Sequence, residues 1–290
     1  MPDVMVLQCM INFIYSLNPL LVFNIGASDI LTDLCTPFVT TASLPCSCDY
    51  PVTCSKYMIV GRKINTEETE YINRLSYQNV IEANYNYIYR DSELVYNIKD
   101  YNIPDNKFLI AVVGYRLEKE MNKDFIELID KILNMKISDR LKEECAEPYI
   151  VIIGNFDNPD KLLSSVSEVN REKIKFIGQI NDAGEFVSLC KLYINPDRSG
   201  GGRSSFESLH HGIPVVTLNK GDVYYTCGDS FAVEDWEKYY EIVNKYYIDL
   251  EFYNLQREKA FKRADELENL QMTLEEIIGK ITTSSEKEDL

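Results

Sequence analysis

The chain has 290 residues, of which 45% are hydrophobic and 26% charged, a composition typical of a soluble globular protein with room for more than one domain. Its 46 acidic residues outnumber its 30 basic ones, which gives a formal net charge of -16. A surface this acidic repels nucleic acids and anionic lipids, so we expect neither as a partner, and an anionic ligand needs a local basic pocket.

The amino-terminal residues are apolar but lack the features of a signal peptide or a membrane span. No basic segment precedes them, Asp3 and Gln8 interrupt the apolar run, and no stretch of about 18 apolar residues follows. We therefore expect a cytoplasmic protein without a transmembrane segment, in which the 8 cysteines are free thiols. The spacing of Cys46, Cys48 and Cys54 does not match that of zinc ligands, so no metal site is expected there.

The first 75 or so residues predict a partial α/β domain. Residues 20–26 and 37–43 have the apolar, β-branched character of strands, and a helix is expected from Asp29 between them. Residues 76–105 are rich in Tyr and Asn and follow no single pattern. We interpret this segment as the connection into the next domain.

Residues 106–235 predict a second α/β domain with a mostly parallel sheet, because apolar strand segments alternate with amphipathic helical segments. Strands are expected at residues 107–114, 149–154, 173–178, 191–195 and 213–218. Helices are expected at residues 117–132, 158–169 and 182–190 and from residue 204. Residues 236–290 show only helical patterns and end in a polar tail that we expect to fray.

A glycine-rich turn follows the strand at residues 191–195, where the sequence reads NPDRSGGGRSSFESLHHGIPVVTL. Gly200 to Gly202 let a ligand approach the backbone, and the helix that follows directs its positive dipole end at the same place. With Arg203 and Ser204, this combination suits a phosphate or diphosphate. SSFE also fits a capping box in which Ser204 caps the helix and Glu207 reaches back, so both interpretations remain open.

Other phosphate-binding motifs are absent from the sequence. There is no Walker-type G-x-x-x-x-G-K-[ST], and the strand at residues 107–114 is not followed by the glycines of a dinucleotide fingerprint. Arg116 and Lys119 stand there instead, just past the end of the strand. They are either phosphate contacts or solvated surface charges.

Several segments, in this order, resemble those of a known family. VVGYRL with Lys119, FIGQI, SGGGRSSFESLHHGIPVVTL and GDV together resemble the carboxyl-terminal, nucleotide-sugar-binding domain of GT-B fold glycosyltransferases. Within that group the chain is similar to bacterial sugar transferases related to the O-GlcNAc transferase and HMW-type adhesin glycosyltransferase families. The resemblance covers roughly residues 106–235. It implies a Rossmann-like domain of GT-B type, preceded by a partial acceptor-side domain and followed by carboxyl-terminal helices.

The resemblance also implies a donor site for a nucleoside diphosphate sugar. Arg116 would hold the diphosphate with Lys119 as a second contact, and Glu207 would accept the ribose hydroxyls. Asp222 and Tyr224, in a loop after the last strand, would face the sugar or form a plain turn. The diphosphate would be lined by Gly201, Gly202, Arg203 and Ser204. The base would be held by the backbone of Gly178, Gln179 and Ile180.

The implied activity is transfer of a sugar from a nucleoside diphosphate sugar, with UDP favoured, to a protein or glycan acceptor without a metal or cofactor. Many retaining GT-B enzymes have a Glu where this chain has Ser199, which favours an inverting reaction. No residue is identified as the catalytic base, and an oligomer is possible. Because the acceptor-side part is short, a non-catalytic chain that binds a sugar nucleotide or a partner transferase is the alternative. A sugar-nucleotide epimerase is a further enzyme that the same fold allows.

Two further groups of residues are assigned structural roles. The only histidines precede Gly212 at the end of the predicted helix, where capping of helix carbonyls is expected rather than a phosphate contact; they are His210 and His211. The aromatic residues of the next helix are expected to pack in the core; they are Tyr239, Tyr240, Tyr246 and Tyr247.

Overall fold

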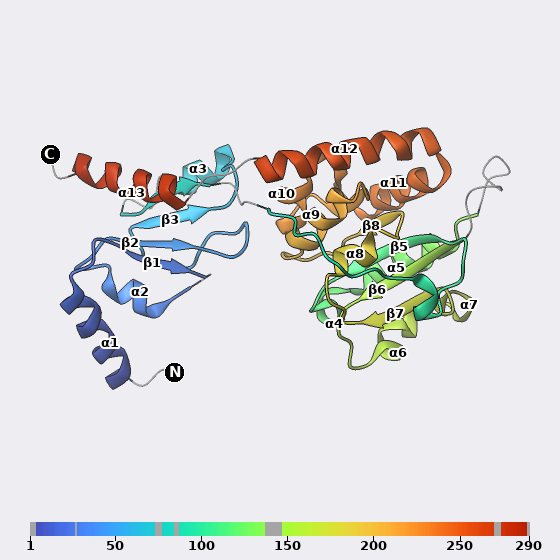
Figure 1. The fold of residues 1–290 in the computed structure, drawn as a ribbon, viewed down its shortest axis with the longest axis horizontal. Coiled ribbons are helices and arrows are strands. Elements are labelled where there is room, and N and C mark those ends of the chain that lie inside the picture. The colour runs from blue at the N-terminus through green and yellow to red at the C-terminus, as the bar shows by residue number, and fades with distance from the viewer. Residues whose placement is uncertain are drawn as a thin grey trace. The chain divides into compact units, whose positions relative to one another are not determined.

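The computed structural model describes residues 4–26, 28–72, 77–83, 87–136, 147–269 and 274–288. The chain forms two compact units, one from residues 1–86 with 270–290 and the other from residues 87–269. Each unit has its own parallel sheet and its own helices (Figure 1). The units differ from the predicted segments in two places: the expected connection is divided between them, and so is the carboxyl-terminal helical region.

The first unit is built on a four-stranded parallel sheet in the order β1-β2-β3-β4. The strands are β1 (Val22–Ile25), β2 (Thr41–Leu44), β3 (Tyr57–Val60) and β4 (Asn79–Glu82). The strand predicted at residues 20–26 is confirmed as β1. The one predicted at 37–43 starts only at Thr41, because the chain first turns where the Phe38 and Val39 amides bond to the Cys35 carbonyl. β4 lies within the expected connection, and its polar ends hid it from the sequence pattern.

The helices of the first unit are α1 (Val4–Leu17), α2 (Ile30–Cys35), α3 (Thr66–Ile72) and α13 (Leu274–Glu288). α2 begins where expected, because the Asp29 carboxylate accepts a hydrogen bond of 2.9 Å from the Thr32 amide. On α13, Ile277 and Ile281 are buried in one apolar cluster with Tyr57 of β3. This pair, one turn apart, anchors α13 on the sheet, and the tail that was expected to fray is therefore helical as far as Glu288.

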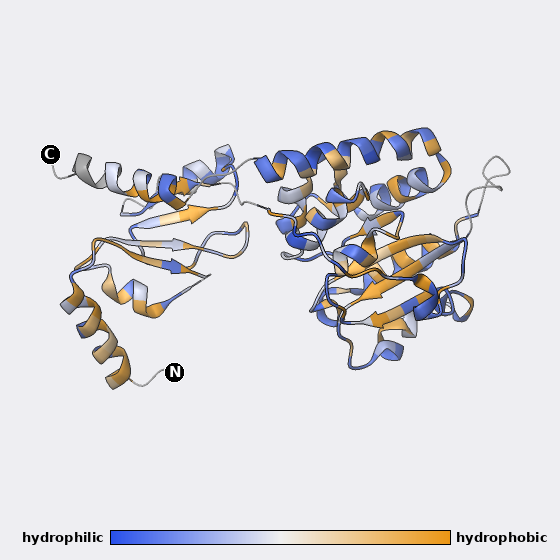
Figure 2. Ribbon diagram, viewed as in Figure 1, coloured by the Kyte–Doolittle hydropathy of each residue, from blue (hydrophilic) through white to orange (hydrophobic). Residues whose placement is uncertain are grey.

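α1 differs from the other helices in having an uncharged and exposed surface. None of its residues is charged and none is buried; Met5 and Phe13, for example, are 76% and 63% exposed. Figure 2 shows apolar residues along the length of this helix. Within the described parts of the chain, no helix has both the length and the apolarity required to cross a membrane.

The second unit contains a six-stranded parallel sheet in the order β10-β9-β8-β5-β6-β7. Five strands lie where the sequence predicts them: β5 (Phe108–Val113), β6 (Pro148–Ile153), β7 (Ile174–Gly178), β8 (Leu192–Ile194) and β9 (Val215–Leu218). The short edge strand β10 (Ala232–Val233) was not predicted, because two residues carry no periodic pattern. The strand order reverses between β5 and β8, and ligands of open α/β sheets bind at the carboxyl ends of such strands.

Alternate residues of β5 face two apolar layers, as the period of a strand requires. Ile110 and Val112 join a cluster with α5 (Lys123–Leu133) and α11 (Trp236–Ile248). Ala111 and Val113 join a second cluster with α9 (Gly202–His210) and α12 (Leu250–Asn269). All six residues of β5 are buried, which makes this strand the rigid centre of the unit.

Two predicted helices are divided in the structure. The helix expected at residues 117–132 consists of α4 (Leu117–Glu120) and α5, because Asn122 caps α5 by accepting a hydrogen bond of 2.9 Å from the Phe125 amide. The helix expected at 158–169 is likewise a series of short turns. The remaining elements are α6 (Pro159–Leu162), α7 (Glu168–Arg171), α8 (Ala183–Val187), α10 (Gly221–Cys227) and the short 3-10 helices η1 (Ile98–Tyr101), η3 (Leu163–Ser165) and η4 (Asp229–Phe231).

Tyr239 ties α11 to the carboxyl ends of β8 and β9. Its ring is fully buried, and its hydroxyl accepts a hydrogen bond of 2.8 Å from the Asn195 amide while also lying within hydrogen-bonding distance of the Val216 carbonyl. The packing role predicted for the four tyrosines is confirmed, since three are buried and Tyr240 packs, half-buried, against the same core.

We expect Tyr239→Phe to lower the free energy of unfolding of the second unit by about 1–3 kcal/mol, because it leaves the buried Asn195 amide without its partner. The measurement is urea unfolding followed by the fluorescence of Trp236, the only tryptophan. Tyr240→Phe, at a half-buried ring on the same helix, is the matched control and should change little. Equal stabilities for the two variants would contradict this assignment.

Candidate functional site

The glycine-rich loop joins β8 to α9 at the carboxyl end of the central strands. Gly201 has a φ of 108°, a conformation that favours glycine, and α9 begins at Gly202. The capping-box interpretation is therefore wrong: the helix starts before Ser204, whose hydroxyl donates a hydrogen bond of 3.1 Å to the Gly201 carbonyl. Among the residues that the structure describes, no side chain caps α9. The amides of its first turn and the positive end of its dipole thus suit an anion.

Arg116, just past β5, approaches the same loop. Its side chain is 65% exposed, its Nε pairs with Glu120 Oε1 at 3.1 Å, and its Nη2 lies 3.3 Å from where a Cβ on Gly200 would stand. Lys119 is exposed on α4, the short helix that follows. The structure therefore places Arg116 beside the glycines, while the contacts of both cations with a diphosphate stay predictions.

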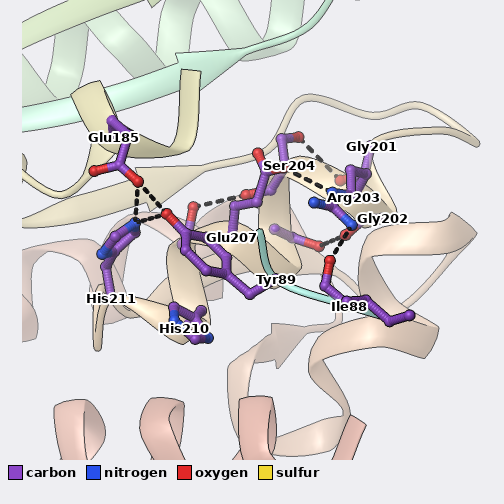
Figure 3. Close-up of polar contacts among 12 residues, drawn as sticks. Ile88, Tyr89, Glu185, Gly201, Gly202, Arg203, Ser204, Glu207, His210 and His211 are labelled. Atoms are coloured by element: carbon purple, nitrogen blue, oxygen red, sulfur yellow. Dashed lines mark hydrogen bonds and ion pairs between the residues drawn. The ribbon is translucent and has the colours of Figure 1, made fainter. Parts of the chain in front are cut away.

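Glu207 and Arg203 are paired with each other on α9. Arg203 Nε donates a hydrogen bond of 2.7 Å to Glu207 Oε1, and its Nη1 donates one of 2.8 Å to the Ile88 carbonyl (Figure 3). The other oxygen of Glu207 lies 3.2 Å from where a Cβ on Gly184 would stand, so the absence of a side chain on α8 makes room for the carboxylate. The carboxylate predicted to accept ribose hydroxyls is therefore already occupied on one side by a guanidinium.

The three residues predicted to contact the base lie at the end of β7 and in the loop that leads to α8. Gly178 has a φ of 77° and open space where a Cβ would stand. Gln179 is exposed and accepts a hydrogen bond of 2.9 Å from the Asn155 side chain, and Ile180 packs, half-buried, against an apolar cluster of the unit. Because α8 carries Gly184 next to Glu207, this loop and α9 are neighbours.

Asp222 and Tyr224 lie on helix α10 and not in a loop, which corrects the prediction for both. The Asp222 amide donates a hydrogen bond of 2.7 Å to the Ser199 carbonyl, and its Cβ is 3.3 Å from where a Cβ on Gly202 would stand. Asp222 is therefore part of the surroundings of the glycine-rich loop. Tyr224 donates instead to Asp229, at 2.9 Å, a carboxylate that raises the pKa of Tyr224.

Residues 87–96, which we call the strap, lie along α9 and α8 and belong to the second unit. The Tyr87 hydroxyl is 2.9 Å from the Thr226 hydroxyl and 2.8 Å from where a Cβ on Gly202 would stand. Tyr96 donates to the Asn181 carbonyl, and Ser92 donates to Asp182 at 2.7 Å. A side chain at position 202 would collide with the Tyr87 hydroxyl, so the strap requires glycine there whether or not a ligand binds.

Tyr89, near the start of the strap, contacts both histidines (Figure 3). Its ring stacks on His210 with centroids 3.7 Å apart, and its hydroxyl donates to the Glu185 carboxylate and lies 2.8 Å from His211 Nε2. Burial and the Glu185 carboxylate raise the pKa of Tyr89. The histidines therefore hold the strap, whereas the sequence predicted that they cap helix carbonyls.

Sequence reasoning missed the strap and also Arg198, whose side chain is only 4% exposed beneath the glycine-rich loop. Tyr89 meets Glu185 and His211 from 96 and 122 residues away in sequence, so no local pattern announces these contacts. For Arg198 a signal existed, since it is an arginine directly before the glycines. Of the three closely spaced cysteines, Cys46 and Cys54 are exposed free thiols, and no group of metal-ligating side chains occurs among the described residues.

The fold is that of GT-B glycosyltransferases. The chain superposes on a Thermobaculum terrenum O-GlcNAc transferase mutant with a TM-score of 0.64 and 13% identity, covering 99% of this chain and 55% of that one. On the pneumococcal O-GlcNAc transferase GtfA in complex with UDP and GlcNAc it superposes with a TM-score of 0.59 and 11% identity, covering 96% of this chain and 59% of that one. On WaaG, a glycosyltransferase involved in lipopolysaccharide biosynthesis, it superposes with a TM-score of 0.52 and 17% identity, covering 76% of this chain and 61% of that one. The chain thus spans less than two thirds of each of these proteins.

Residues 96–263 match the family model of the glycosyl transferases group 1. This match covers more than half of the chain, which therefore belongs to that family. It includes the glycine-rich loop, α9 and Arg116, and it extends on both sides beyond the segment in which the sequence motifs were found. No match was found among curated protein sequences.

We expect His211 to make the second unit less stable in mild acid. Burial lowers the pKa of His211 below its ordinary 6.5, an effect that Glu185 opposes and His210 reinforces. The unfolded chain then binds a proton more readily than the native one, so the free energy of unfolding falls as the pH drops below about 6.5 towards the lowered pKa.

The measurement compares the wild-type chain with His211→Gln by urea unfolding between pH 7 and pH 5. Glutamine keeps a hydrogen-bond donor for Tyr89 but does not titrate, so the variant should lose less stability over this range. Parallel losses in the two proteins would assign the pH dependence to carboxylates and contradict the role of His211.

Proposed function

We propose that the chain binds a nucleoside diphosphate sugar, with UDP as the nucleotide, and transfers the sugar to a hydroxyl or amide of a protein or glycan acceptor. The observation that carries this proposal is the uncapped amino end of α9 with Arg116 beside it, inside a segment that belongs to a glycosyltransferase family. The similar pneumococcal O-GlcNAc transferase holds UDP, which supports UDP as the nucleotide.

The diphosphate would lie against Gly200 to Gly202, where it meets the first-turn amides of α9. Charge builds up on the diphosphate as the sugar leaves, and donors fixed in place before the reaction stabilise that charge without reorganising. Arg116 would supply one cation from the β5 side, with Lys119 as a second. On this basis we propose a reaction that requires neither a metal ion nor another cofactor.

The ribose would hydrogen-bond to Glu207 and the base to the backbone of residues 178–180. Arg203 donates a hydrogen bond to Oε1 of Glu207, so ribose hydroxyls have to replace this guanidinium or use the second oxygen. The exchange is possible because a carboxylate has acceptor sites for two hydroxyl donors as well as for guanidinium donors. Arg203 keeps its bond to the Ile88 carbonyl meanwhile, or turns to the diphosphate.

The acceptor would be bound with help from the first unit, and an inverting displacement remains the proposed outcome because position 199 holds serine. We also propose a cytoplasmic location, where free thiols such as those of this chain persist. A chain that binds UDP but transfers no sugar would fit the alternative of a non-catalytic partner subunit.

We expect titration calorimetry to show UDP binding to the wild-type chain in the micromolar range, with GDP and ADP weaker. Arg116→Ala and Glu207→Ala should each raise the Kd about 10- to 100-fold, the effect of losing one charge-assisted hydrogen bond. Lys119→Ala should have a smaller effect, because this side chain is a second contact only.

Lys107→Ala is the matched control. It also removes one cation, but Lys107 lies at the amino end of β5, the end away from the glycine-rich loop, where it pairs with Glu147 at 3.0 Å. If Lys107→Ala weakens UDP binding as much as Arg116→Ala, general charge and not the site is responsible. If none of the three nucleotides binds to the folded chain, the proposed donor site is wrong for this chain.

A further inference from the structure

Arg198 is a buried cation at the carboxyl ends of the two central strands. Its side chain is 4% exposed. Nη2 donates hydrogen bonds of 2.7 Å to the Val113 carbonyl at the end of β5 and of 2.9 Å to the Tyr193 hydroxyl on β8, and Nε donates one of 2.8 Å to the Asn195 side chain. The guanidinium fork thus joins β5 to β8 at the point where the strand order reverses.

Two glycines leave the space that this guanidinium occupies. A Cβ on Gly114 would stand 2.1 Å from Arg198 Nη1, and a Cβ on Gly201 would stand 2.6 Å from Nη2. Both distances are far below van der Waals contact with atoms that are held by hydrogen bonds. Glycine at these two positions is therefore required by Arg198, in addition to any need for a ligand to approach the backbone.

Glu120 connects Arg198 to Arg116. Arg198 Nη1 lies 3.1 Å from Glu120 Oε2, and Arg116 Nε lies 3.1 Å from Glu120 Oε1. The three side chains carry two positive charges and one negative charge, and their exposure rises from 4% for Arg198 through 15% for Glu120 to 65% for Arg116. The buried Arg198 neutralises part of the charge of the Glu120 carboxylate. The exposed Arg116 is therefore held less strongly by Glu120 than it would be as its only partner.

We propose that Arg198 is a positioning residue of the donor site, which fixes the glycine-rich loop from below and, by sharing Glu120, leaves the Arg116 guanidinium available to a diphosphate. This inference rests on the proposed function. We place Arg198 behind the site and not in contact with the ligand, because its side chain is 4% exposed and four of its five N–H groups donate to Val113, Tyr193, Asn195 and Glu120. A lysine at this position would keep the charge but cannot reach all these acceptors at once.

The test uses Arg198→Met, Glu120→Gln, Arg116→Ala and the double variants Arg198→Met/Glu120→Gln and Arg198→Met/Arg116→Ala in the full chain. In Arg198→Met, Glu120 has Arg116 as its only cation, so we expect the Kd for UDP to rise at least about tenfold. Adding Glu120→Gln removes the carboxylate that holds Arg116 and should restore the part of the affinity that Arg116 supplies, although the loop contacts of Arg198 stay lost. In the Arg116→Ala background, Arg198→Met should have a much smaller effect than in the wild-type chain.

A second readout needs no ligand. The rate at which phenylglyoxal modifies Arg116, followed by peptide mass spectrometry, should fall in Arg198→Met, because a guanidinium paired fully with a carboxylate reacts more slowly. It should recover in Arg198→Met/Glu120→Gln. A residue that merely fills space would not be rescued by a change at Glu120. Arg198→Gln, which also removes the charge but keeps a polar group for the buried acceptors, gives the same comparison should Arg198→Met fail to fold.

The outcomes separate this inference from the proposed function. If the wild-type chain binds no UDP, the proposed function fails, and the modification rates still decide whether Arg198 controls Arg116. If UDP binds and Arg198→Met neither weakens it nor slows the modification of Arg116, the positioning role is overturned. Loss of UDP binding that Glu120→Gln does not restore, and that adds fully to Arg116→Ala, overturns it as well.

Discussion

The carboxyl ends of β5 and β8 depend on the burial of one guanidinium. A charge taken out of water destabilises the native state unless hydrogen-bond acceptors and a counter-charge surround it, and here these come from two strands and a helix. Asn195 connects Arg198 to α11. Its side-chain oxygen accepts a hydrogen bond from Arg198, and its backbone amide donates one to the Tyr239 hydroxyl. The loop over the guanidinium is thereby fixed to α11, on the far layer of the sheet. The shape of the glycine-rich loop follows from these contacts before any ligand is present.

The strap imposes a second constraint from the other side of α9. Tyr89 holds it through the histidines and Glu185, and the Ile88 carbonyl accepts from Arg203, which in turn holds Glu207. Two residues predicted to contact the donor, Arg203 and Glu207, are thus already bonded to each other, and Arg203 is also bonded to the strap. A ligand that engages Glu207 changes the partner of Arg203, and the strap is the next group to which this change can pass. The strap is therefore bonded, through Arg203, to the carboxylate that the proposed donor site would use.

Much of the second unit was predictable, because β5 and its neighbours are buried on both faces and read as continuous apolar runs. The position of Arg116 beside the glycines was also predictable, since the carboxyl ends of parallel strands meet at one edge. The wrong predictions concern backbone conformation and long-range contacts, which the local sequence pattern does not reveal. The capping box assumed that α9 starts at Ser204, but the αL conformation of Gly201 starts it earlier. Asp222 was placed in a loop because its helix is short, and the partners of Tyr89 are too distant in sequence to be inferred.

An acidic chain is an unexpected partner for an anionic ligand. The pairing of charges around the glycine-rich loop explains how such a ligand could still bind there. Around the glycine-rich loop, Arg116 and Arg198 share Glu120, Arg203 pairs with Glu207, and Asp222 lies beside Gly202, so the positive and negative charges of these side chains balance. Attraction for the proposed diphosphate would then come from the amino end of α9 and from the incomplete pairing of Arg116, which act at distances shorter than the Debye length of about 8 Å at physiological salt. Such a site favours a compact anion that fits the loop, whereas the net charge of -16 repels an extended polyanion that must also lie over the surrounding surface. The acidic surface that argues against nucleic acid as a partner would therefore also make the proposed site selective for a small diphosphate.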